Sequence, residues 1–313
     1  MIRVILRKLG STAVVVAVVA VIVFLLIHIS PGDPAAIIAG DRATSADIEH
    51  IRQSLGLDQP LIVQFGLWVG RLMHGDLGVS LFSRMPVATL VAGRVEPTVS
   101  LAIATMLFAV STALPLGILA AWQVGRWVDR AIMVLAIVAF SFPIFIIGYG
   151  LVWGFALKLR LLPVQGYTTL ANGFVPYLQH LILPAVSLGL VFMALLTRMT
   201  RSTMIEVLGE DYIRTARAKG LGQLAILLRH ALKNAAVPIV TTIGSGIALL
   251  IGGVVVTESV FSIPGIGRLT IDAVTQRDYP VIQGVILISS FAYVLVNFVI
   301  DLSYRLFDPR IQG

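Results

Sequence analysis

The sequence contains no cysteine, which excludes disulfide bonds, thiolate metal sites and thiol catalysis within this chain. Charged residues are also scarce, at 12% of the 313 residues, whereas hydrophobic residues make up 58%. The mean hydropathy is +0.95. Soluble globular domains are less apolar than this, and such a composition is typical of a polytopic membrane protein.

Common catalytic and nucleotide-binding motifs are missing as well. The sequence has no GxxxxGK[ST], and no lysine follows a glycine anywhere in it, so it has no phosphate-binding P-loop. It has no HExxH and no GxSxG, and its five histidines do not have ligand-like spacing. We therefore expect the chain to have no ATPase site, no metal site, no catalytic residues and no cofactor of its own.

Six apolar windows are long enough, or nearly so, to cross a hydrocarbon core of about 30 Å, which takes roughly 20 helical residues. They cover residues 10–29, 98–121, 131–157, 178–197, 236–257 and 281–300. The pattern predicts an all-α membrane protein with six transmembrane helices in a single domain over residues 1–313. Pro115, Pro143 and Pro184 fall within or beside windows and predict kinked, packed helices.

The net charge of +7 comes from Lys and Arg clustered beside the apolar windows. Lipid headgroups and membrane orientation explain such clusters, and nucleic-acid binding is not expected. With the N-terminus inside, the inner segments hold fourteen Lys and Arg and the short outer loops hold four. The bias predicts both termini in the cytoplasm, residues 30–97 as an extracytoplasmic loop or small cap, and residues 198–235 as a cytoplasmic loop.

Residues 30–97 are too numerous for a structureless connection and predict local helices. Thr44 to Asp47 supply capping oxygens before Ile48, Ile51 and Leu55, which are spaced as one helical face. Residues 64–73 form a second candidate helix, whose Phe65 and Trp68 could rest on the membrane surface or meet an external partner. The membrane surface is favoured, because Trp is enriched there.

No Asp, Glu, Lys or Arg lies inside the six windows, although ion-coupled carriers usually need ionisable groups there. An uncharged interior favours a pathway driven by energy from elsewhere, with an ion-gradient-driven secondary transporter as the alternative. Polar residues that could line such a pathway are Ser141, Tyr149, Ser289, Ser290 and Asn297. Hydrogen bonding between packed helices is the more common use of such residues.

The segment 206–234 is basic and helix-forming. Residues 206–219 predict one helix whose acids precede its bases, as the helix dipole favours. Gly220 to Gly222 permit a sharp turn. An amphipathic helix is predicted after the turn by Leu221, Leu224, Leu227, Leu228, Ala231 and Leu232. This element could anchor on the membrane surface or dock another protein, and composition alone favours the anchor.

The string EDYIRTARAKG at residues 210–220, followed by His230, Lys233-Asn234 and Pro238, resembles the cytoplasmic signature of the dipeptide, oligopeptide and nickel permeases of ABC importers. The resemblance covers nearly the whole chain, through PGDP (31–34), LGLDQP (55–60), GDLG (75–78), RDYP (277–280) and DPR (308–310). The sequences EDYIRTARAKG and RDYP are most similar to those of permeases for glutathione or short peptides.

The resemblance implies a type I ABC importer permease, multi-pass in the bacterial inner membrane. It also implies a second homologous permease, two cytoplasmic ATPase subunits that bind ATP and Mg, and an extracytoplasmic substrate-binding protein. The expected substrate is a short peptide or a related solute such as glutathione, with a chelated metal such as nickel as the alternative. Residues 198–235 then become the coupling loop, the segment that contacts the ATPase, in place of a lipid anchor.

Within the coupling loop, the resemblance assigns the ATPase contact to Glu210, Asp211, Arg214, Thr215, Ala216, Arg217, Ala218, Lys219 and Gly220. The small residues Ala216, Ala218 and Gly220 would permit close approach. Arg214, Arg217 and Lys219 would offer charge-assisted hydrogen bonds to acidic groups on the partner. The broader importer superfamily carries a Glu-Ala-Ala, three residues, Gly pattern here, of which only Ala216 and Gly220 are present.

Overall fold

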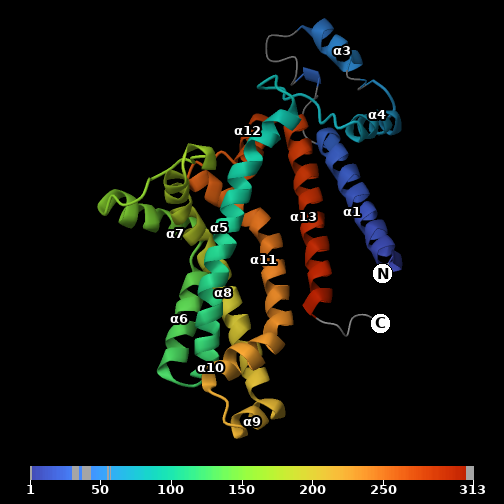
Figure 1. Cartoon of the computed structure of the whole chain (residues 1–313). Helices are drawn as coiled ribbons and strands as arrows, with labels where there is room; N and C mark the ends of the chain where they lie inside the picture. The colour runs from blue at the N-terminus through green and yellow to red at the C-terminus, as the bar shows by residue number, and fades with distance from the viewer. Residues whose placement is uncertain (1, 30–34, 37–43, 55, 57, 308–313) are drawn as a thin grey trace. The chain divides into compact units, whose positions relative to one another are not determined.

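The structure is a computed structural model that describes residues 2–29, 35–36, 44–54, 56 and 58–307. The described part is almost entirely helical (Figure 1). The motifs PGDP and DPR, and Leu55 of the predicted helical face, lie outside the described residues. The longer helices are α1 (Ile2–Ile29), α3 (Ser45–Ser54), α4 (Leu61–Met73), α5 (Val87–Trp122), α6 (Trp127–Ser141), α8 (Phe174–Leu208), α11 (Leu232–Val260), α12 (Ile266–Gln276) and α13 (Tyr279–Phe307).

Short helical segments connect the long ones. They are α7 (Ile144–Leu151), the π-helical η1 (Val152–Lys158), η2 (Leu170–Asn172), α9 (Asp211–Ala218), α10 (Gln223–Ala225) and the π-helical η3 (Ile226–Ala231). The predicted outer-loop helices are confirmed by α3 and α4. The apolar window 98–121 lies within α5, which begins eleven residues earlier, at Val87.

Four of the described helical segments are long and apolar enough to cross a membrane, and a fifth is added if one bent pair counts as a single span. The four are Val87–Trp122, Phe174–Leu208, Gln223–Ile247 and Tyr279–Phe298. By the same measure Val14–Ile29 is a shorter apolar helix. The apolar windows therefore fall on helices as expected, while the count of six spans and the cytoplasmic location of both termini stay predictions.

The third predicted window, residues 131–157, is not one continuous helix. Trp127–Ser141 and Ile144–Lys158 meet at an angle of 102°. Pro143 has no N–H to donate and disfavours helical geometry at the residue before it. Phe142 accordingly adopts an extended conformation, with φ −86 and ψ 133. Pro115 and Pro184 differ in outcome, because α5 and α8 continue through them.

The chain forms two compact units, one of residues 1–94 and 269–294 and the other of residues 95–268 and 295–313. In the second unit α8 packs against α6, α7 and α11. Close approach between α8 and α5 depends on glycine, because a Cβ at Gly189 would lie 2.6 Å from the Phe108 ring. A Cβ at Gly117 would lie 2.6 Å from Thr200. Small residues at such crossings allow helices to pack tightly.

In the first unit, the aromatic residues of α4 contact α1. The ring centroids of Phe65 and Trp68 lie 5.2 and 5.7 Å from that of Phe24. The His28 ring lies within hydrogen-bond distance of Gln64, at 3.1 Å. The prediction that Phe65 and Trp68 rest on the membrane surface misses these contacts, because the sequence gives no sign that α4 folds back onto α1.

The aspartate of the RDYP motif holds a turn in the same unit. Asp278 is buried and accepts hydrogen bonds from the Ser80 hydroxyl at 2.5 Å and the Leu81 N–H at 3.1 Å. Ser80 lies two residues after the GDLG motif, and Gly78 of that motif packs near Pro280 of RDYP. Two motifs far apart in the sequence thus form one folded corner.

Asp278→Ala is expected to lower the free energy of unfolding by about 1–3 kcal/mol, because it leaves a buried hydroxyl and a backbone N–H without an acceptor. Asp272→Ala, at an exposed position on α12, is the matched control and should have little effect. Thermal melting of the purified chain in detergent checks both. Equal melting temperatures for the two variants would contradict the role given to Asp278.

Candidate functional site

The predicted coupling loop contains the end of α8, the short segments α9, α10 and η3, and the start of α11, and α9 lies just beyond the end of α8 (Figure 1). Its acid-to-base order is as predicted, with Asp211 in the first turn and Arg217 in the last. The predicted helix 206–219 is, however, two helices. Glu206 belongs to α8, which ends at Leu208, and Gly209 and Glu210 separate it from α9.

The turn after α9 is a Schellman motif centred on Gly220. The Gly220 N–H donates to the Arg217 carbonyl at 2.9 Å, and the Leu221 N–H donates to the Ala216 carbonyl at 3.3 Å. Gly220 has φ +81, which glycine adopts without the strain that a Cβ causes. Gly222 has φ −64, so the backbone does not require glycine there. The predicted elbow is confirmed and depends on Gly220 alone.

The inner face of α9 is part of the hydrophobic core of its unit. Ile213 and Ala216 are buried in a cluster with Met204, Ile226 and Leu227. The Ala216 methyl group therefore faces this chain and is not available for the close contact with a partner that the resemblance implied. Sequence reasoning missed Ile213, although its spacing three residues before Ala216 is that of one helical face.

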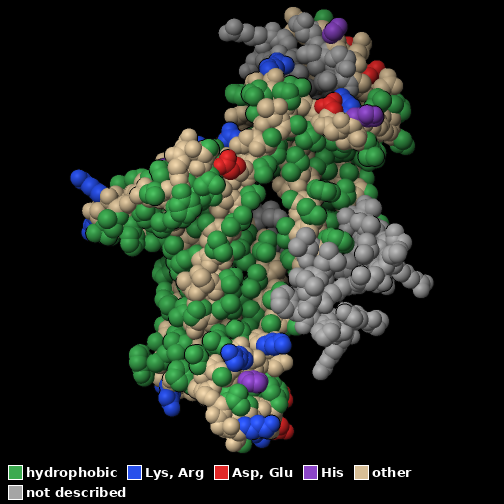
Figure 2. Space-filling model, in the orientation of Figure 1, with side chains coloured by type: hydrophobic (Ala, Val, Ile, Leu, Met, Phe, Trp, Pro, Cys, Tyr) green, Lys and Arg blue, Asp and Glu red, His purple; other side chains and the backbone are tan. Residues whose placement is uncertain are grey.

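The other residues assigned to the ATPase contact are exposed: Glu210, Asp211, Arg214, Thr215, Arg217, Ala218, Lys219 and Gly220. Arg214 and Asp211 form an ion pair at 3.1 Å, with side chains 73% and 93% exposed. Such an exposed pair stabilises the helix little and leaves both groups able to bind elsewhere. Figure 2 shows Lys and Arg side chains gathered at the end of the second unit that carries α9.

Tyr212 connects α9 to the start of α11. Burial raises the pKa of the Tyr212 phenol, and its hydrogen bond with the Asn234 side chain acts in the opposite direction. Asn234 also donates to the His230 carbonyl at 2.8 Å. Tyr212, His230 and Asn234 all belong to the sequence signature, and the structure brings them together as the joint between the two arms of the loop.

The second arm departs from the predicted amphipathic helix. Ile226, Leu227 and Ala231 are buried, but Leu224 and Leu228 are 69% and 47% exposed. Residues 226–231 are π-helical, and the wider turn rotates the buried face away from the spacing of an ordinary helix. The arm also continues directly into α11.

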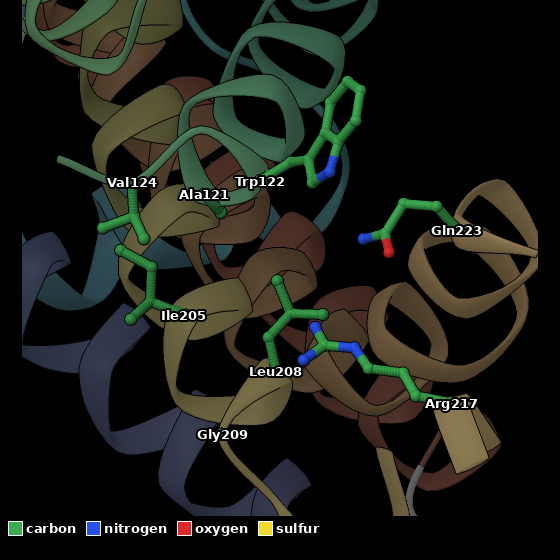
Figure 3. A pocket seen from close by; sticks show the side chains of 8 residues that line it. All are labelled: Ala121, Trp122, Val124, Ile205, Leu208, Gly209, Arg217 and Gln223. Carbon is green, nitrogen blue, oxygen red and sulfur yellow. The ribbon is translucent and has the colours of Figure 1, made fainter. Parts of the chain in front are cut away.

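A pocket with a volume of about 250 Å³ lies beside α9 (Figure 3). Arg217 and Gln223 extend into it from α9 and α10, and Trp122 lies at the end of α5. Its full lining is Ala121, Trp122, Val124, Ile205, Leu208, Gly209, Arg217 and Gln223. The turn between α5 and α6 is therefore part of the surface beside α9, which the spacing of residues 206–234 alone could not indicate.

The five predicted pathway residues lie on three helices, two beside the break between α6 and α7 and three on α13. Ser141 and Tyr149 are exposed, on either side of the break between α6 and α7, and the Ser141 hydroxyl donates to its own helix at Ile137. Ser289, Ser290 and Asn297 are half-buried on α13. None of the five lines the pocket of Figure 3. Their role in a pathway stays a prediction.

Comparison with known proteins identifies the family. Residues 113–313 match the binding-protein-dependent transport system inner membrane component, and residues 1–102 match the N-terminal region of that membrane component. A probable peptide ABC transporter permease protein, y4tP, of Sinorhizobium fredii is 50% identical over 308 residues, covering 98% of each chain. The glutathione transport system permease protein GsiC of Escherichia coli K12 is 43% identical over 312 residues, covering 100% of this chain and 99% of that one.

The fold also matches solved structures. The methionine ABC transporter MetNI in an inward-facing conformation gives a TM-score of 0.58 at 17% identity, over 71% of this chain and 97% of that chain. A second crystal form gives 0.59 at the same identity. The helical architecture is therefore that of an ABC transporter permease, and the chain belongs to the family of inner membrane components of binding-protein-dependent transport systems.

Proposed function

We propose that this chain is the permease subunit of an ATP-driven importer that carries short peptides or glutathione across the bacterial inner membrane. The observation that carries the proposal is the identity of 50% to a probable peptide permease and 43% to a glutathione permease, each over essentially the full chain. The chain crosses the membrane six times, with both termini in the cytoplasm and residues 30–97 outside.

The working transporter contains this chain, a second homologous permease, two ATPase subunits and an extracytoplasmic binding protein. ATP and Mg are bound by the ATPase subunits, because this sequence has no P-loop. The exposed face of α9, from Glu210 to Gly220, meets an ATPase subunit. Its arginines suit carboxylates on that partner.

The buried face of α9 supports a route by which movement of the ATPase is transmitted to the membrane-spanning helices. Ile213 and Ala216 fix the helix in the hydrophobic cluster that also contains Met204 of α8 and Ala235 of α11. A tightly packed interior transmits displacement because it cannot be compressed. When the ATPases close on ATP, α9 therefore carries the inner ends of α8 and α11 with it.

Transport in proteoliposomes containing the complete complex tests the proposal. Labelled glutathione and labelled dialanine should accumulate only when ATP and the binding protein are supplied, and ionophores should not prevent it. Accumulation that ionophores abolish and ATP does not support would favour the ion-gradient alternative. Accumulation of a nickel chelate with neither labelled peptide would favour the metal alternative.

The double variant Arg214→Glu/Arg217→Glu is expected to reduce ATP-dependent uptake about tenfold or more, because charge-assisted bonds to the ATPase become repulsions. Its matched control is Arg84→Glu/Arg160→Glu, which changes the net charge equally at exposed positions outside the coupling loop. Uptake and co-purification of the ATPase subunits check both variants. If the control loses as much uptake as the coupling-loop variant, α9 is not the specific contact.

A further inference from the structure

An ion pair with a buried carboxylate joins α6 to α8 near α9. The Arg201 Nε donates to Asp129 Oδ1 at 2.5 Å, and Arg201 Nη2 donates to Oδ2 at 2.8 Å. The Gly125 N–H also donates to Oδ2, at 2.9 Å. Asp129 is only 3% exposed. The carboxylate therefore has three donors from two separate parts of the chain, in a geometry that fixes both distance and orientation.

The ion pair lies between the start of α6 and the part of α8 that leads to α9. Arg201 lies on the part of α8 that leads to α9, and Asp129 lies in the first turn of α6. Gly125 lies in the turn between α5 and α6. Val124 and Ile205, which are close in sequence to the pair, line the pocket beside α9. The ion pair thus ties the α5–α6 turn and the start of α6 to the helix that carries α9.

Apart from the ion pair, the buried contacts that α6 makes with its neighbours are apolar. Its buried residues besides Asp129 are Ile132, Ala136 and Ala139. Apolar contacts are non-directional, whereas a two-bond guanidinium–carboxylate pair fixes the orientation of the groups that it joins. Removing the second bond should therefore loosen the register between α6 and α8 without unfolding either helix.

We propose that Asp129 and Arg201 are a positioning pair that transmits displacement of α9 to α6, and through α6 to the bend at Phe142 and Pro143. This inference rests on the proposed function, because it requires an ATPase to move α9. The pair touches no substrate. Its role is to make α6 follow α8 when the inner end of α8 moves.

The natural absence of cysteine allows a direct test in the complete transporter. Single cysteines replace Leu224, an exposed residue on the arm beside α9 and outside the proposed contact (the α9 label), or Trp127, an exposed residue at the start of α6 (the α6 label), and carry an environment-sensitive fluorophore. A non-hydrolysable ATP analogue is added, and the fluorescence change is measured at each site. In the otherwise unchanged chain, both labels should respond.

In Arg201→Lys, which keeps the charge but loses the two-bond geometry, the α9 label should respond fully and the α6 label should fall to about one fifth of its response. Asp129→Asn should act in the same way. The matched control is Arg198→Lys, an exposed arginine one turn earlier on α8, and both labels should respond in it. Co-purification of the ATPase subunits, which a transmission defect leaves unchanged, separates it from misassembly.

A full α6 response in both Arg201→Lys and Asp129→Asn would overturn the proposal, since α6 would then follow α8 without the pair. Loss of the α9 response in these variants would overturn it too, because the pair would be needed for docking. If the α9 label shows no fluorescence change in the otherwise unchanged chain, both the proposed coupling role of α9 and this inference are rejected. A response at α9 without one at α6 in that chain rejects only the inference.

Discussion

Gly265→Ala is expected to be among the most damaging single-methyl additions in the described chain, because the added Cβ would overlap the carboxylate of Glu258. Glu258 is fully buried at the end of α11 and accepts hydrogen bonds from the Thr98 hydroxyl at 2.6 Å and the Arg268 N–H at 2.9 Å. The Thr98 hydroxyl in turn accepts the Ile266 N–H at 2.8 Å. Displacing the carboxylate breaks the connection of this corner to α5.

We expect Gly265→Ala to cost about 2–4 kcal/mol, the sum of overpacking and lost hydrogen bonds. Thermal melting of the detergent-purified chain measures it. Gly93→Ala is the control, since a Cβ at Gly93 meets nothing within 4 Å. In a Glu258→Ala background the clash is gone, so Gly265→Ala should add much less there. Equal costs in both backgrounds would show that Glu258 does not fill the space beside Gly265.

Ala216→Asp and Ala218→Asp should have opposite consequences although they lie two residues apart on α9. Ala216 is buried in the hydrophobic cluster, so an aspartate there is expected to cost about 3–5 kcal/mol and to detach α9 from its unit. Ala218 is exposed, so Ala218→Asp should melt like the parent chain while binding the ATPase subunits more weakly.

Melting temperature and co-purification of the ATPase subunits, measured on both variants, distinguish these outcomes. Proteolysis within residues 209–222 should also increase for Ala216→Asp, because a detached α9 is accessible to proteases. Should Ala216→Asp melt like the parent, the inner face of α9 would not be part of the core. Should Ala218→Asp retain full ATPase binding, the exposed face would not be the contact.

The membrane-spanning helices were predictable because a long run of apolar residues indicates a helix in lipid whatever its tertiary contacts are. The elbow at Gly220 was predictable for a similarly local reason. The π-helical turn at residues 226–231 was not, because the spacing of Leu224 and Leu228 fits an ordinary helix. The sharp break at Pro143 could not be separated from the continuous helix at Pro184, since both prolines follow apolar residues and only packing distinguishes them.

The polar contacts that fix the two units were beyond sequence reasoning altogether. Asp129 and Arg201 are 72 residues apart, and Ser80 and Asp278 are 198 apart. No periodicity joins such residues. The sequence signature marks Asp278 within RDYP, but only the structure explains it, as the acceptor for the turn at Ser80.

The backbone of α9 and the chemistry of its surface are set by different residues. Ile213, Ala216 and Gly220 fix the shape, whereas Arg214, Arg217 and Lys219 are free to change without altering it. Under the ATPase contact proposed for α9, closely related transporters in one cell can therefore keep the same backbone there and still avoid exchanging ATPase subunits, through charge substitutions alone. A transporter that uses only its own ATPase could therefore be engineered by substituting these three exposed residues together with the residues that they contact on the ATPase.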